Sequence, residues 1–252
     1  MLAGAQPELA ARIGIAMTLL QLGIGIVNDL VDAPRDAGRK PGKPIPAGLV
    51  PIGPARALAV GCFAAGLGLA ALIAPIVGLL AVVVIAIGLA YDLRLKGTAW
   101  SWLPFAVGIP ILPVFGWVGA TGAPHPAFLV LVPVAVVAGA ALAIGNALVD
   151  VERDRAVGAS SIAIALGEDR AAWLAAALFA TVLVAALVSA WAGGRQAGEL
   201  AAMAVLGGAP VVAALLVRTA DSGGRERAWQ VEAVGLAGLA IVWMSGLGGT
   251  LI

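Results

Sequence analysis

Charged and chemically reactive side chains are scarce in this sequence. Only 12% of its 252 residues are charged, and the chain holds one cysteine, one histidine and one tyrosine. A single cysteine, Cys62, excludes an intrachain disulfide framework and a Cys-x-x-Cys metal or redox site. Because 15 Lys and Arg offset 14 Asp and Glu, the net charge of +1 gives no electrostatic reason to expect a nucleic-acid partner. Any chemistry must therefore come from where the few charges sit.

Apolar residues are abundant instead. They make up 62% of the chain, against about 45–50% of an ordinary soluble domain. A transmembrane helix needs about 20 predominantly apolar residues. Segments of this kind predict an all-α, polytopic transmembrane bundle of eight helices, forming a single domain over 1–252. The expected spans are 11–28, 55–74, 75–91, 101–121, 127–149, 171–192, 197–217 and 229–250.

The basic residues divide unequally between the two sides of this predicted bundle. Counting connections alternately places 13 of the 15 Lys and Arg on one side, where Arg225–Arg227 form the last loop, and only Arg12 and Arg195 on the other. Short cytoplasmic loops accumulate Lys and Arg, so we expect the basic side to face the cytoplasm. A span missed in mid-chain would exchange the sides of all later loops, so this bias supports the count of eight. The sequence thus predicts an integral protein of the cell membrane.

Acidic residues gather on the same side, in two matching motifs. Residues 28–36, NDLVDAPRD, align with residues 146–154, NALVDVERD, and share Asn, Leu, Val, Asp, Arg and Asp in register. The copies lie 118 residues apart, which indicates two pseudo-repeated four-helix halves. Because both motifs close a helix at the same face, we expect them to converge on one cavity. Pro34 and Gly158 suggest that the last Asp of each motif lies on an unwinding turn.

The spacing of these motifs points to a bound cation. Asn, Asp and Asp at i, i+4 and i+8 project from one helical face. Carboxylates so placed repel unless a cation lies between them, and Mg²⁺ prefers carboxylate, water and phosphate oxygens. Basic residues follow in the loop 37–54, in Tyr91–Lys96 and after the second motif. Acid clusters flanked by Lys and Arg suit a magnesium-bridged diphosphate. The alternative is that the aspartates are solvated helix-end charges neutralised by neighbouring arginines, which two matched copies make less favourable.

These motifs resemble those of the UbiA superfamily of intramembrane prenyltransferases. The family's NDxxDxxxD motif is matched by Asn28, Asp29, Asp32 and Asp36, and its DxxxD motif by Asp150 and Asp154. Other stretches are also similar to the family's: Lys43–Gly48 to its RPIPxG run, with Lys where Arg is usual, Tyr91–Lys96 to its Tyr/Lys loop, and 158–167 to the stretch after its second motif. Members usually have nine transmembrane helices, with the first motif after the second helix. Here it follows the first predicted span, so we expect a leading helix to be missing.

The resemblance implies Mg²⁺-dependent transfer of an allylic prenyl group from an isoprenoid diphosphate to a lipophilic acceptor within the membrane. It assigns metal binding to Asn28, Asp29, Asp32, Asp36, Asp150 and Asp154, and diphosphate binding through the metal to Asn28, Asp32, Asp36, Asn146, Asp150 and Asp154. Asp29 is the weaker ligand, since it is rotated by about 100° from Asn28 on an ideal helix.

Charge development on the leaving diphosphate would be stabilised by Lys96, with Lys43 or Arg155. The prenyl cation needs a dry, electron-rich pocket, which Tyr91 would face. Alternatively, Tyr91 is an interfacial aromatic with its hydroxyl among the lipid headgroups.

Other functions share some of these features. A transporter would place its acidic residues near the bilayer midplane rather than at one edge. A CDP-alcohol phosphotransferase needs an Asp-Gly element followed by Ala-Arg, and the sequence contains no Asp-Gly. A soluble isoprenyl diphosphate synthase lacks this hydropathy. Within the superfamily, a prenyl-diphosphate cyclase and a non-catalytic isoprenoid-binding or transport protein stay open. The sequence does not predict the acceptor, the prenyl length or the oligomeric state.

Overall fold

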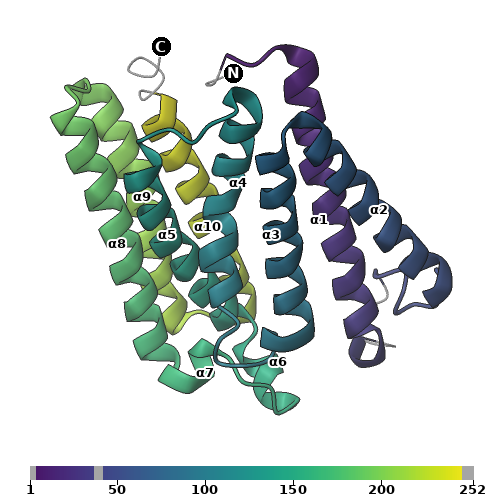
Figure 1. The fold of residues 1–252 in the computed structure, drawn as a ribbon. Coiled ribbons are helices and arrows are strands. Elements are labelled where there is room, and N and C mark those ends of the chain that lie inside the picture. The colour runs from purple at the N-terminus through teal and green to yellow at the C-terminus, as the bar shows by residue number, and fades with distance from the viewer. Residues whose placement is uncertain (1–3, 37–41, 246–252) are drawn as a thin grey trace. The chain divides into compact units, whose positions relative to one another are not determined.

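The computed structural model describes residues 4–36 and 42–245, and all regular secondary structure within them is helical (Figure 1). The elements are α1 (Pro7–Asp36), α2 (Ile52–Ile73), α3 (Pro75–Ala90), the π-helical turn η1 (Tyr91–Leu95), α4 (Leu103–Thr121), α5 (Phe128–Val149), α6 (Val151–Ala156), α7 (Ile162–Leu166), α8 (Glu168–Ala192), α9 (Ala197–Leu216), the 3-10 turn η2 (Val217–Thr219) and α10 (Ser222–Ser245).

Eight segments of the described chain are long and apolar enough to cross a bilayer, which confirms the predicted all-α architecture and its count of spans. Two predicted boundaries were wrong. The first helix does not end near residue 28 but runs on to Asp36, and α10 begins at Ser222, so that Arg225–Arg227 lie in its first turns rather than in a loop. Polar residues lower the hydropathy of a helix end without removing its backbone hydrogen bonds, and hydropathy therefore misplaced both ends.

The predicted spans 55–74 and 75–91 are two separate helices, joined at a single residue. Ala74 takes an extended conformation (φ −165°, ψ 150°), and Pro75 opens α3 at a position where its missing N–H costs nothing. Gly78 then lets the two helices meet closely, since a Cβ there would lie 3.1 Å from the Cα of Ala71. The two helices form a hairpin, and η1 directly follows its second helix.

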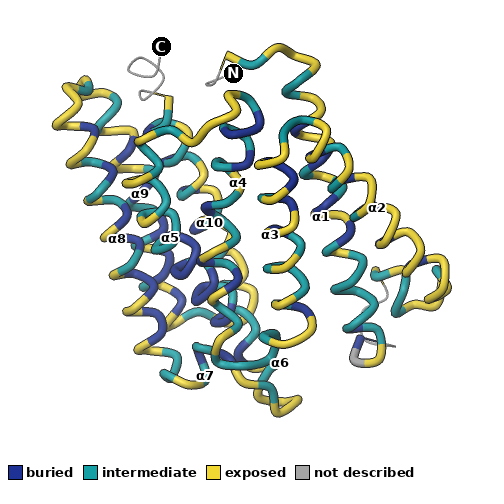
Figure 2. Tube along the Cα trace, in the orientation of Figure 1, coloured by how far each residue is buried: buried dark blue, intermediate teal, exposed yellow. Residues whose placement is uncertain are grey.

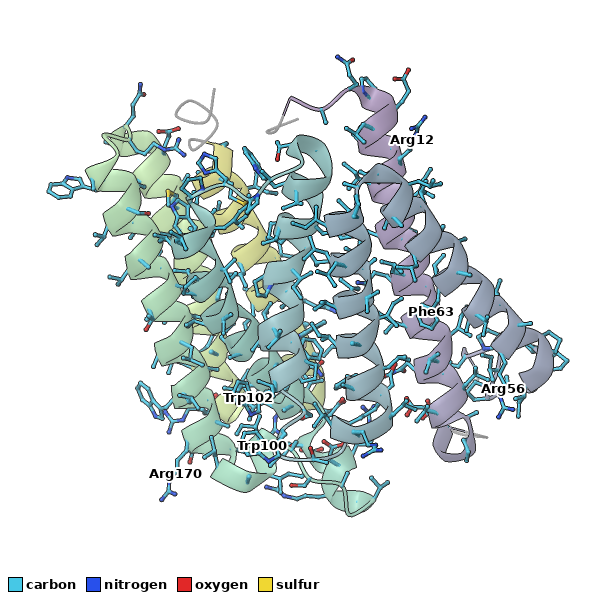
Figure 3. All side chains as sticks on the ribbon, viewed as in Figure 1. Arg12, Arg56, Phe63, Trp100, Trp102 and Arg170 are labelled. Carbon is cyan, nitrogen blue, oxygen red and sulfur yellow. The ribbon has the colours of Figure 1, made fainter. Side chains whose placement is uncertain are left out.

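The chain divides into two compact units, each with its own packed interior. The first unit comprises Ala3–Lys96 and Ile111–Phe128, and the second comprises Gly97–Pro110 and Leu129–Ile252. The first is packed around larger side chains, among them Leu20, Val77 and Phe115. It also fits the ring of Phe63 against α1 at Gly23 (Figure 3). The first acidic motif belongs to this unit.

The second unit is packed mainly through alanine. Ala141, Ala171, Ala172 and Ala175 are fully buried in its largest cluster, beside Phe179. Small residues let helix backbones approach closely, which is how helices associate in lipid, where apolar side chains gain little from contact with each other. The second acidic motif belongs to this unit.

Exposed residues recur along the helices of both units (Figure 2), and many of them are large and apolar. Leu72, Leu129 and Trp191 are each more than 70% exposed. In a water-soluble protein such surfaces would be a liability. Here they are the surface that an integral membrane protein presents to lipid.

Close packing of α5 predicts a specific weak point. A Cβ added at Gly139 would lie 2.6 Å from the carbonyl oxygen of Phe105, a backbone atom that cannot move aside. We expect Gly139→Ala to destabilise the protein by about 1–3 kcal/mol. Gly61→Ala is the control, because nothing lies within 4 Å of its Cβ position, and it should be neutral or slightly stabilising. Thermal unfolding in lipid checks this, and equal melting temperatures for both variants would contradict it.

Candidate diphosphate and metal site

The first acidic motif occupies the last turns of α1. The expectation that Asp36 lies on an unwinding turn was wrong, because α1 continues through Pro34 to Asp36. Proline removes one N–H from a helix, but its fixed φ is itself helical. The motif therefore keeps its helical spacing over its whole length. Asp32 and Asp36 are buried, and Asp29 is partly exposed.

The ammonium group of Lys43 lies among these carboxylates. Its Nζ lies 2.7 Å from Asp29 Oδ1, 3.1 Å from Asp36 Oδ2 and 3.7 Å from Asp32 Oδ2. The run after Lys43 folds into a compact turn in which the amide of Ala47 donates to the Lys43 carbonyl, and Gly48 closes the turn with a positive φ of 74°. One ammonium group thus contacts three aspartates, including Asp29, which was expected to be the weaker ligand.

The charge of Lys43 responds to this setting. Partial burial alone would lower its pKa, but hydrogen bonds to Asp29 and Asp36, together with their negative charges, raise the pKa above its ordinary value. Lys43 is therefore held as a cation among the carboxylates.

A second lysine reaches the same motif from η1. Lys96 Nζ lies 2.5 Å from Asp32 Oδ2 and 5.8 Å from the centre of the Tyr91 ring. The π-helical turn places these side chains, since the amide of Lys96 donates to the carbonyl of Tyr91 at 2.9 Å. The first unit thus gathers the predicted residues Asp29, Asp32, Asp36, Lys43, Tyr91 and Lys96.

Asp92 is a site residue that sequence reasoning missed. It is 4% exposed, and Asn28 Nδ2 donates to its Oδ1 at 2.7 Å. Its Oδ2 is buried and has no hydrogen-bond partner among the described residues. The side chain of Asn28 was predicted to bind the metal. In the structure its side-chain amide group donates to Asp92. The available signal was a lone acidic residue at the end of an apolar span, directly after Tyr91.

The second motif is bent where the first is straight. Asp150 lies between α5 and α6 (φ −91°, ψ 0°), and Asp154 lies within α6. Backbone hydrogen bonds still link Asp150 to Asn146 and Asp154 to Asp150, so the helical path continues through the bend. Asp150 pairs with Arg153 at 2.6 Å. Burial, then the charge of Asp150, raises the pKa of Asp154, against the opposing charge of Arg153.

Arg155 is directed away from the motif carboxylates. Its Nη1 lies 2.8 Å from Glu168, which also pairs with Arg225 at 2.8 Å. Arg225 in addition donates to the carbonyl of Leu148 near the end of α5. Arg225 therefore links α10 to α5 and α8, which is a structural role. The sequence did not reveal this role, because it placed Arg225 in a loop.

The donor chemistry of the first unit suits a hard divalent cation. Within residues 4–36 and 42–245, no three His, Cys, Asp or Glu side chains are gathered closely enough to form a ready-made metal site. The carboxylates of the first motif are instead spread around the ammonium of Lys43, and all their donor atoms are oxygen, as Mg²⁺ prefers. A cation therefore fits in chemistry, in competition with Lys43 for the same oxygens.

Comparison with known proteins identifies the family. The chain matches the UbiA prenyltransferase family over residues 2–245. It belongs to that family. By this membership it is a prenyltransferase, which confirms the resemblance seen in its motifs and removes the transporter and phosphotransferase alternatives.

Similar proteins are known by sequence and by structure. The chain is 31% identical over 241 residues to a digeranylgeranylglyceryl phosphate synthase of Methanopyrus kandleri, covering 94% of this chain and 87% of that protein. A protein of the same description from Methanoregula boonei is 32% identical, with 75% and 69% covered.

Two solved structures share the fold. A UbiA homologue from Aeropyrum pernix K1 superposes with a TM-score of 0.74 at 22% identity, covering 95% of this chain and 92% of that one. One from Archaeoglobus fulgidus, bound to GPP and Mg²⁺, has a TM-score of 0.70 at 17% identity, with 95% and 89% covered.

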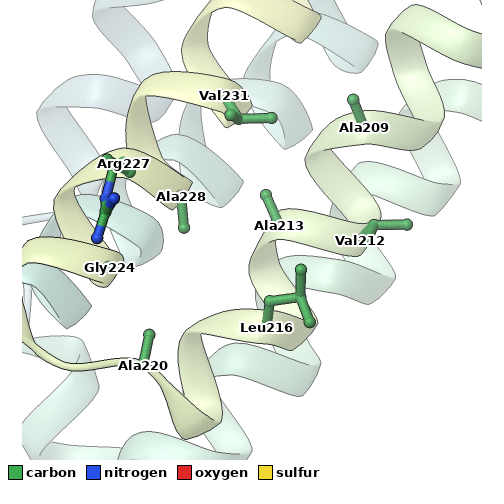
Figure 4. Close-up of a pocket in the computed structure, with 9 residues that line it drawn as sticks. All are labelled: Ala209, Val212, Ala213, Leu216, Ala220, Gly224, Arg227, Ala228 and Val231. Atoms are coloured by element: carbon green, nitrogen blue, oxygen red, sulfur yellow. The ribbon is translucent and has the colours of Figure 1, made fainter.

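An apolar pocket of about 470 Å³ lies elsewhere in the second unit, between α9 and α10 (Figure 4). Its lining is Ala209, Val212, Ala213, Leu216, Ala220, Gly224, Arg227, Ala228 and Val231. None of the candidate site residues is among them. The pocket suits hydrocarbon rather than the chemistry of a diphosphate.

The shared ammonium makes a prediction about metal affinity. Replacing Lys43 with Met removes the competing charge, so Mg²⁺ should stabilise the variant at a concentration about five- to tenfold lower than it needs for the natural protein, equivalent to about 1–1.4 kcal/mol. The melting temperature, followed across a Mg²⁺ titration, measures this. Arg56→Met removes a like charge from an exposed position in the same unit and should leave the titration unchanged. A Lys43→Met titration midpoint equal to or above that of the natural protein would refute the shared site.

Proposed function

We propose that this prenyltransferase transfers an allylic prenyl group from an isoprenoid diphosphate to a lipophilic acceptor within the membrane, with Mg²⁺ as its cofactor. The observation that carries this proposal is the meeting of three motif carboxylates with two lysines in the first unit. The Archaeoglobus fulgidus homologue bound to GPP and Mg²⁺ supports the choice of both ligands.

The residues proposed to hold the metal are Asn28, Asp29, Asp32 and Asp36 of the first motif and Asn146, Asp150 and Asp154 of the second. When bound, Mg²⁺ supplies positive charge to the oxygens of the diphosphate. The matching sequence of the two motifs supports giving both of them a role in binding the metal. The proposal also places both at the cytoplasmic face, supported by the basic residues gathered there.

The lysines are proposed to stabilise the leaving diphosphate. Lys96 is held by Asp32 and Lys43 by the motif as a whole, so both ammonium groups are positioned before negative charge develops on the leaving oxygens. Tyr91, next to Lys96, would present its ring to the prenyl cation. Arg155 could assist only after exchanging its partner Glu168 for the diphosphate.

We further propose that the acceptor is a prenylated glyceryl phosphate. Support comes from the two relatives described as digeranylgeranylglyceryl phosphate synthases, one of which aligns over 94% of this chain. Such an acceptor offers a hydroxyl as nucleophile, a hydrocarbon chain soluble in the bilayer and a phosphate at the interface.

The function is tested with purified protein in lipid, labelled prenyl diphosphates and a panel of acceptors, with and without Mg²⁺. We expect product only with Mg²⁺ and most product with the prenylated glyceryl phosphate. An Asp32→Ala, Asp150→Ala double variant should lose nearly all turnover. Unchanged turnover in that variant would defeat the assignment, diphosphate release without acceptor would show a cyclase, and binding without turnover would show a non-catalytic protein.

Lys96 gives a sharper prediction within this scheme. Lys96→Met should lower kcat by about 10²–10³-fold, because a positioned donor to developing negative charge is lost. Arg94→Met, two residues away at an exposed position, is the matched control and should retain activity. Steady-state kinetics decides the matter, and a kcat for Lys96→Met within threefold of the control would remove Lys96 from the mechanism.

A further inference from the structure

Glu232 is the most unusual residue of the second unit. It lies in the middle of α10, is 0% exposed, and neither of its carboxyl oxygens has a hydrogen-bond partner among the described residues. An acidic residue within a transmembrane helix costs about 2.5–3.5 kcal/mol to insert. Buried polar groups are almost always hydrogen-bonded, and an unpaired one in a membrane helix indicates a functional site.

The second unit makes room for this carboxyl group. Gly145 of α5 faces it, and a Cβ at that position would overlap Glu232 Oε2 and lie 3.1 Å from Glu232 Cδ. The carboxyl group therefore occupies a notch that only glycine leaves open. Gly145 immediately precedes Asn146, the first residue of the second motif.

A second unsatisfied group shares the notch. The same Cβ at Gly145 would lie 3.3 Å from Trp229 Cδ1, the ring atom bonded to Nε1. Trp229 Nε1 is buried and, within the described residues, has no acceptor. The indole N–H of Trp229 and the two carboxyl oxygens of Glu232 thus lie next to Gly145 without forming a hydrogen bond with each other.

Apolar residues flank this pair in the sequence. Ile144 and Leu148 of α5 belong to the largest buried cluster of the unit, and Ala228 and Leu236 of α10 pack against that cluster. A ligand at this place must accept a hydrogen bond from the indole and donate one to a carboxyl oxygen. A hydroxyl group does so, because it donates one hydrogen bond and accepts others.

We propose that Glu232 and Trp229 bind the hydroxyl group of the prenyl acceptor, with the carboxyl group accepting from the hydroxyl and the indole N–H donating to its oxygen. This inference rests on the proposed function and extends it, by assigning the acceptor headgroup to residues outside both acidic motifs. Because Glu232 is 0% exposed, a hydroxyl group held by it would be shielded from water.

The test compares two probes on the full chain in lipid, a prenylated glyceryl phosphate with a free hydroxyl and the same molecule with hydrogen in its place. The natural protein should bind the hydroxyl form about tenfold more tightly. In Glu232→Leu this preference should fall to about onefold, and KM for the hydroxyl acceptor should rise about tenfold. KM for the prenyl diphosphate should stay unchanged. Trp229→Phe should lose part of the preference, and Glu232→Gln should keep part of it.

Glu232→Leu removes an unpaired buried carboxyl group, so it should fold at least as stably as the natural protein. Glu226→Gln, on an exposed turn of the same helix, and Trp173→Phe, at an exposed indole, are the matched controls and should keep the full preference.

Several outcomes would overturn the inference. If Glu232→Leu keeps the preference for the hydroxyl form, Glu232 does not bind the acceptor. If the variant shifts stability and both KM values alike, the carboxyl group holds a structural water only. Failure of the proposed function looks different, since the natural protein would then turn over no prenyl diphosphate with any acceptor, and the inference would fall with it.

Discussion

The free-energy cost of holding ionised carboxylates at the edge of a bilayer is the constraint on which the first unit depends. An ionised group at the edge of a bilayer must be solvated, paired or bound to a cation. The first unit meets this demand with two lysines that reach the end of α1 from separate segments. Removing either lysine would leave the carboxylates at the end of α1 with less compensating charge, so the segments that carry the lysines are tied to α1 by electrostatics as well as by packing.

The local structure follows from that requirement. Because α1 continues without a break through Pro34, Asp29, Asp32 and Asp36 stay within reach of a single ammonium group. The second lysine is placed by η1, a π-helical turn that is wider than an α-helical turn and directly follows α3. Lys96 comes immediately after η1 and contacts Asp32. π-helical turns are rare in proteins and are frequent at functional sites, where they redirect a few side chains without ending the helix.

Hydropathy and spacing predicted much of this from the sequence, for physical reasons. The number of spans follows from bilayer thickness, and the common face of Asp32 and Asp36 follows from helical periodicity, so both could be predicted without tertiary information. Helix ends could not, because α10 begins among charged residues that favour a loop by composition. Asp92 and Glu232 were missed because a lone acid in an apolar run has no pattern. Only the packed structure reveals that Asn28 turns to Asp92, or that Gly145 leaves a notch for Glu232.

The charge balance of the first unit explains why lysine and a metal can share one motif. Three carboxylates, Asp29, Asp32 and Asp36, face two ammonium groups, Lys43 and Lys96, which leaves a net charge of −1 before Asp92 is counted. Without a bound cation, these residues repel a diphosphate. A divalent cation bound by the same oxygens would raise this charge by two and would compete with Lys43 for its carboxylates. Under the proposed function, Lys43 and Lys96 would then be available to the oxygens of the diphosphate. The carboxylates and lysines are therefore paired with one another without a ligand, and the proposed metal would make the same residues attractive to an anion.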